Sequence, residues 1–168
     1  MASQQPRWIA VLILLGAGFF IFALLLSAVF DPRIRLLHIL QALIYLAVIV
    51  LTRRNSAWGF GAGCLISAFW NYINLFVTTF IRNGAEQFWA FLHTGHLPRP
   101  DLAIALVAAL GHFMLIIGCL AGFLRQHPRV RDWLKFFAGG ALVIVYFLLI
   151  IVTTGRQYIP LMKKVFHL

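Results

Sequence analysis

The sequence predicts an all-α integral membrane bundle of five transmembrane helices, with a short interfacial helix between the third and the fourth. Apolar residues make up 62% of the 168 residues, whereas Lys and Arg number 14 and Asp and Glu only 4. This composition is typical of a chain whose apolar solvent is lipid. Five apolar stretches can each cross about 30 Å of hydrocarbon at about 1.5 Å per residue. We therefore expect a single transmembrane domain over residues 1–168.

Breaks at charged residues and prolines separate the five stretches, which cover residues 8–30, 34–51, 57–81, 102–124 and 133–154. The first stretch follows Arg7 as a signal peptide would, but it is too long and ends at Phe30-Asp31-Pro32 without a small-x-small cleavage site. We expect it to be a retained helix. Residues 84–96 hold an apolar cluster around Trp89 that is too short to cross the membrane, which favours an interfacial helix.

The formal net charge of +10 comes from Lys and Arg residues in short loops and at the ends of spans. Such residues anchor helices at headgroup depth, so the expected partners are membrane lipids, including anionic headgroups, and not nucleic acid. Five spans put the termini on opposite sides, which we name side A (N-terminus) and side B. Lys and Arg divide equally, seven to each side. Because those of side A are concentrated in two very short loops, we expect side A to be cytoplasmic.

A stripe of polar residues runs along the third stretch at spacings of three and four residues, which place it on one face of a helix. The stripe consists of Cys64, Ser67, Asn71, Asn74, Thr78 and Arg82. Its amides cannot face hydrocarbon without a cost of several kcal/mol, so they must face protein, water or a ligand.

Counting residues from side B places polar residues of four spans in one layer about 6 to 18 Å deep. The second span contributes His38, Gln41 and Tyr45 on one face, the fourth His112 and the fifth Tyr146. An antiparallel second and third span would pair Gln41 with Asn74, His38 with Thr78 and Tyr45 with Asn71. The candidate ligand-binding residues are therefore Asn71, Asn74, Gln41, Tyr45, His112, Tyr146, His38, Thr78 and Arg82, with Glu86, His93 and His96 at the mouth of the site.

This layer has several interpretations. It can be a set of interhelical hydrogen bonds, or it can line a cavity open to side B in a small carrier or ligand-binding protein for a neutral, amphipathic or weakly anionic ligand. The alternatives are a non-catalytic accessory subunit, in which a partner helix covers the stripe, and a lipid-modifying enzyme using Glu86, His93 or His96 at the side-B interface. No catalytic signature is present, and assembly into a homo-oligomer or a larger complex stays open.

We expect no cofactor. A haem would need two facing imidazoles, but His38 and His112 differ in depth by about 9 Å. A metal site built from Glu86, His93, His96 and Asp101 would need a helical turn that Gly95 and Pro98 disfavour. Both cysteines, Cys64 and Cys119, lie inside predicted spans, and we expect them to be small buried residues without a disulfide.

Overall fold

The computed structural model describes residues 5–97 and 99–165, which are helical almost throughout and contain no strand. The elements are α1 (Arg7–Phe30), η1 (Pro32–Ile34), α2 (Arg35–Arg53), α3 (Ala57–Tyr72), η2 (Ile73–Val77), α4 (Phe80–Thr94), α5 (Pro100–Leu124), α6 (Val130–Thr154), η3 (Arg156–Tyr158) and α7 (Ile159–Val165). Five helices are long and apolar enough to cross a membrane, so the predicted all-α bundle is confirmed. They fit a multi-pass membrane protein.

Local sequence signals mark where several helices begin and end. The Asp31 carboxylate accepts a hydrogen bond from the backbone N–H of Arg33 at 3.0 Å, and Pro32 opens the turn that leads into α2. The Asp132 carboxylate accepts a hydrogen bond from the backbone N–H of Arg129 at 3.1 Å at the start of α6. These are the positions at which exposed backbone donors need a partner. Gly95 ends α4 in the left-handed conformation, which costs glycine little.

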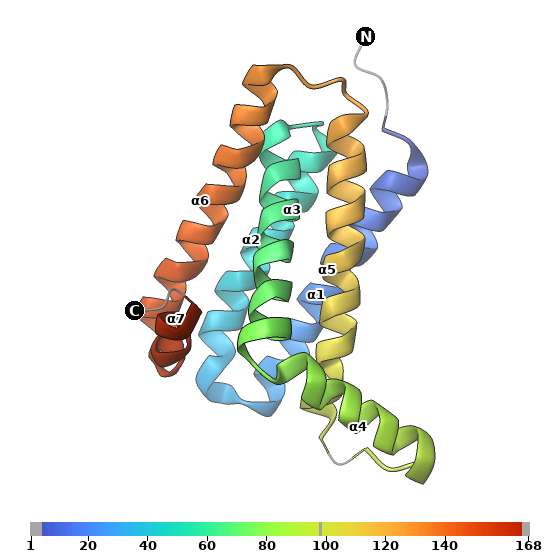
Figure 1. Cartoon of the computed structure of the whole chain (residues 1–168), viewed down its shortest axis with the longest axis vertical. Helices are drawn as coiled ribbons and strands as arrows, with labels where there is room; N and C mark the ends of the chain where they lie inside the picture. The colour runs from blue at the N-terminus through green and yellow to red at the C-terminus, as the bar shows by residue number, and fades with distance from the viewer. Residues whose placement is uncertain (1–4, 98, 166–168) are drawn as a thin grey trace.

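The five long helices form a bundle in which α5 packs against α1 and α3, α3 packs also against α6, and α2 contacts α1, α3 and α6 (Figure 1). The α1–α5 contact is so close that a Cβ added to Gly16 would lie 2.6 Å from the carbonyl oxygen of Gly111. A Cβ on Gly111 would meet the Gly16 oxygen at 2.7 Å in return. Small residues at such crossings let helix backbones approach, as in other membrane bundles.

The third span differs from its prediction because it does not continue as one helix to residue 81. The α-helix ends at Tyr72, a single π-helical turn follows over Ile73–Val77, and Thr78 is extended (φ −109°, ψ 171°) before α4 begins. The predicted interfacial helix therefore begins at Phe80 and not at residue 84, and it leaves the bundle at the side-B end (Figure 1).

Side chains of the polar stripe explain the break. The Asn74 amide donates to the carbonyl oxygen of Trp70 at 3.0 Å, and the Thr78 hydroxyl donates to the Asn74 side-chain oxygen at 3.2 Å. The same hydroxyl accepts a hydrogen bond from the backbone N–H of Phe80 at 3.2 Å. Asn and Thr side chains compete with the helix for backbone partners in this way. Interruptions by π-turns are frequent at functional sites.

Candidate functional site

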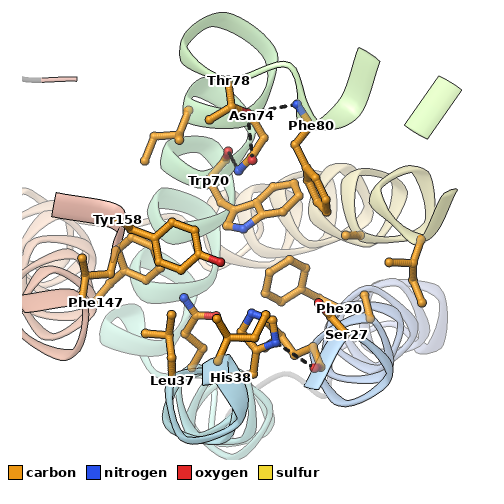
Figure 2. A pocket seen from close by; sticks show the side chains of 18 of the residues that line it. Phe20, Ser27, Leu37, His38, Trp70, Asn74, Thr78, Phe80, Phe147 and Tyr158 are labelled. Atoms are coloured by element: carbon orange, nitrogen blue, oxygen red, sulfur yellow. Dashed lines mark hydrogen bonds between the residues drawn. The ribbon is translucent and has the colours of Figure 1, made fainter. Parts of the chain in front are cut away.

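A cavity of about 370 Å³ lies inside the bundle at its side-B end (Figure 2). Its walls come from α1, α2, the α3–α4 break, α5 and α6, and its rim includes the turn before α2, the start of α4 and η3. Twelve of the twenty lining residues are aliphatic, Phe or Trp. The others are Ser27, His38, Gln41, Asn74, Thr78, Thr79, Asn83 and Tyr158. Within residues 5–97 and 99–165, as far as the side chains are described, no Lys, Arg, Asp or Glu lines the cavity.

The polar wall on α2 consists of His38 and Gln41, one turn apart. The Nδ1 atom of His38 lies 3.0 Å from the carbonyl oxygen of Leu24 on α1. Gln41 is 7% exposed and lines the cavity, and its side chain makes no hydrogen bond to any described residue. Its amide donors and its amide oxygen are therefore available to a molecule in the cavity.

The polar wall at the α3–α4 break is different, because its side chains mostly bind one another. Asn74 and Thr78 take part in the hydrogen bonds that hold the break, and the Asn83 amide donates to the Thr79 hydroxyl at 3.2 Å. These residues shape the cavity and have fewer groups free for a ligand than the α2 wall has.

An aromatic layer lies next to the cavity towards the midplane. The Tyr45 hydroxyl and Nε2 of His112 are 2.7 Å apart, and both side chains are buried, with His112 0% exposed. The rings of Phe20 and Trp70, which line the cavity, pack on the His112 ring with centroids at 3.9 and 4.7 Å. Tyr45 and His112 are therefore brought together, but they lie behind the cavity lining.

Asn71 occupies a position that the polar stripe alone did not distinguish from Asn74. It is 5% exposed, is absent from the cavity lining, and both of its amide atoms are buried without a hydrogen-bond partner among the described residues. The hydroxyl of Ser67, one turn earlier on α3, is in the same condition. In protein interiors, buried polar groups without a protein partner are commonly hydrogen-bonded to buried water.

The expected pairs between α2 and α3 do not form as hydrogen bonds among the described residues. Tyr45 forms a hydrogen bond with His112 and not with Asn71. His38 forms one with the backbone of Leu24 and not with Thr78. Gln41 and Asn74 line the same cavity but form no hydrogen bond with each other. The Tyr146 hydroxyl donates a hydrogen bond to the carbonyl oxygen of Leu40 at 3.4 Å, and Tyr146 does not line the cavity.

The candidate binding residue Arg82 and the residues expected at the mouth, Glu86, His93 and His96, lie on α4 or just beyond it and outside the cavity lining. Arg82 and Glu86 form an exposed ion pair at 3.1 Å, and Nδ1 of His93 lies 2.8 Å from the Trp89 carbonyl oxygen. His96 is exposed beyond the end of α4. The break at Thr78 turns these residues away, because α4 does not extend the line of α3.

Tyr158, which follows the fifth span, is not among the predicted site residues, yet it lines the cavity and its ring points into it (Figure 2). Burial raises the pKa of its phenol above the ordinary value. Ser27 and Asn83 also line the cavity without having been predicted, since single polar residues near span ends carry no periodic signal.

Among the described residues, no three His, Cys, Asp or Glu side chains come together in a metal-binding arrangement, and the side chain of Asp101 lies outside that description. His38 and His112 each bond a different partner. Cys64 and Cys119 are buried free thiols.

Comparisons of the chain with protein-family models, with curated proteins and with solved structures give no match of any of the three kinds.

Proposed function

We propose that this protein binds a small neutral or amphipathic molecule inside the membrane and acts as a ligand-binding protein or carrier for it. The observation that carries the proposal is the cavity of about 370 Å³ with an apolar lining and the unpartnered amide of Gln41 on its wall. Its volume lies within the range of about 300 to 1,000 Å³ common for small-molecule sites. An apolar pocket with a few polar groups binds the body of a ligand by burial and orients it by hydrogen bonds.

None of the described residues that line the cavity carries a fixed charge, which favours a neutral group at the buried end of the ligand. An ionised group there would lose its hydration without gaining a counter-charge, which is expensive in a medium of low dielectric constant. A weakly anionic ligand would have to keep its charge at the rim.

Two alternatives have less support. The accessory-subunit hypothesis needed a partner helix to cover the polar stripe, but Ser67 and Asn71 are covered by this chain's own helices. The enzyme hypothesis relied on Glu86, His93 or His96 at the side-B interface, and these side chains are exposed on or just beyond α4 and do not line the cavity.

A carrier needs in addition a state in which the site is open to side A. In the present state Phe20, Tyr45 and His112 pack together on the midplane side of the cavity. Transport would require these rings to separate, so we expect ligand binding to be measurable before any flux is.

Trp70 provides a direct test because its ring lines the cavity. A variant that retains Trp70 and carries Phe at the other four tryptophans, Trp8, Trp58, Trp89 and Trp133, is reconstituted in lipid nanodiscs. The probe is 10-bromodecan-1-ol, whose bromine quenches tryptophan on contact. We expect saturable quenching on top of the linear quenching that bulk lipid produces.

A matched pair of substitutions locates the probe. Ala108→Leu adds three carbon atoms to the cavity wall, whereas Ala47→Leu adds them to an exposed position of α2. The first should remove the saturable component and the second should leave it. Quenching that is linear with probe concentration in every variant would refute the proposal.

A further inference from the structure

Three side chains with unpartnered hydrogen-bonding atoms line the cavity from α2 and η3, and the Ser27 hydroxyl, also without a partner among the described residues, lines it from α1. His38 and Gln41 come from α2, and Tyr158 from η3 extends its hydroxyl into the same space (Figure 2). Neither the Gln41 amide nor the Tyr158 hydroxyl has a hydrogen-bond partner among the described residues. The facing wall at the α3–α4 break is largely satisfied internally. The ligand's polar group should therefore lie against α2 and η3.

The contact between His38 and Leu24 determines which ring nitrogen carries the proton. A carbonyl oxygen can only accept, so Nδ1, at 3.0 Å from it, must be the protonated nitrogen. A neutral imidazole has one N–H, and Nε2 then carries a lone pair and accepts hydrogen bonds. His38 lines the cavity, and its Nε2 atom makes no hydrogen bond to a described residue.

Gln41 and Tyr158 complement this acceptor. The Gln41 amide offers donors and an acceptor, and the Tyr158 hydroxyl can donate as well as accept. A group that satisfies such a set must both donate and accept through nearly the same atom. A hydroxyl group does this, whereas an ether or a carbonyl oxygen only accepts and leaves Nε2 without a partner.

We propose that the ligand is an uncharged amphiphile with an alcohol hydroxyl, which donates to Nε2 of His38 and accepts from Gln41 or Tyr158. This inference rests on the proposed function, and it specifies the chemical class of the ligand. The apolar part occupies the lining formed by Phe20, Trp70 and their neighbours. At about 30 Å³ per water-sized group, the cavity holds roughly a dozen non-hydrogen atoms, the size of a medium-length alkyl alcohol or of the end of a longer one.

The test compares two isomers, decan-1-ol and 1-methoxynonane, which have the same atoms but differ in whether the oxygen carries a proton. Each competes with 10-bromodecan-1-ol for the quenching of Trp70 at pH 8, where an imidazole with an ordinary pKa of about 6.5 is neutral. Concentrations are compared as mole fractions in the bilayer so that partitioning cancels. We expect the alcohol to compete about tenfold better, as one added hydrogen bond to a buried acceptor predicts.

Variants attribute the preference to His38. His38→Phe should bring the ratio between the two isomers close to one, while Leu36→Phe, which adds a ring on the exposed face of α2, should leave it near ten. If His38→Phe does not fold, the ratio measured in the unaltered protein still decides the question. Decanoate, ionised at pH 8, should compete more weakly than decan-1-ol.

The outcomes separate the two proposals. Equal competition by the isomers, a preference for the ether, or decanoate competing as well as the alcohol would each overturn the hydroxyl assignment and leave the cavity as a binding site. A tenfold ratio that survives His38→Phe would overturn the assignment of Nε2 of His38 as the acceptor. Failure of every compound to compete, together with the absence of saturable quenching, would overturn the proposed function itself.

Discussion

The hydrogen bond between Tyr45 and His112 is the most deeply buried polar contact between two spans that the structure describes, and its removal should be measurable. The Tyr45 hydroxyl lies 2.7 Å from Nε2 of His112, and the exposed fractions are 2% and 0%. Nδ1 of His112 already lacks a partner. Tyr45→Phe would leave both ring nitrogens unsatisfied where water has little access, and the cost of one such buried group is about 1 to 3 kcal/mol of unfolding free energy.

A double-mutant cycle isolates the hydrogen bond from the packing of the two rings. The single variants are Tyr45→Phe and His112→Leu, and the double variant removes both polar groups. Interhelical hydrogen bonds in membrane proteins average about 0.6 kcal/mol and reach about 1.7 kcal/mol. Because this pair is buried on all sides, we expect a coupling energy at the upper end, about 1.5 kcal/mol.

The assay is reversible unfolding in mixed micelles, with denaturing detergent as the variable and tryptophan fluorescence as the signal. Tyr72→Phe is the control because Tyr72 is 47% exposed, and it should change stability by less than about 0.5 kcal/mol. A coupling energy near zero would show that the pair adds nothing to folding, and the view of this layer as structural support for the cavity would be withdrawn.

Two further substitutions test the packing and the side-B turn. Gly16→Ala should destabilise by about 1 to 3 kcal/mol because its Cβ would lie 2.6 Å from the backbone oxygen of Gly111, whereas Gly18→Ala, with nothing within 4 Å, should be neutral or slightly stabilising in the same unfolding assay. Equal effects would argue against the close α1–α5 crossing. Hydrogen bonds from Arg33 hold the pKa of Asp31 below its usual value, so the carboxylate stabilises the turn above pH of about 4 and this contribution disappears as pH falls through the lowered pKa. Asp31→Asn at pH 6 should therefore speed amide hydrogen exchange at Arg33, as strong acid does in the unaltered protein once intrinsic rates are corrected; unchanged exchange would contradict this.

The prediction of five spans succeeded because it depends on properties that are local in the chain. Length and hydropathy of each stretch are read directly from the residues, and hydrocarbon thickness sets a single scale for all of them. The boundaries agree to within a few residues, except in the third span. There the helical periodicity of Asn74, Thr78 and Arg82 continues in the sequence although the helix does not.

The break after Tyr72 could not be predicted from the spacing of polar residues, because the same residues are compatible with two competing arrangements. Asn74 and Thr78 can point along a helix face, or they can bond the backbone and each other. The second arrangement frees the chain to turn at Thr78, and this turn removes Arg82 from the cavity.

The sequence by itself determined that polar side chains of four spans lie at similar depth, because depth follows from counting residues along a helix at a constant rise. Which of them meet was decided only by tertiary structure, since the rotation of each helix about its axis and the distance to its neighbours depend on packing. Glycine contacts such as Gly16 with Gly111 set those distances. The resulting arrangement places Tyr45 on His112, leaves Asn71 enclosed within the bundle, and opens His38, Gln41 and Tyr158 to one cavity.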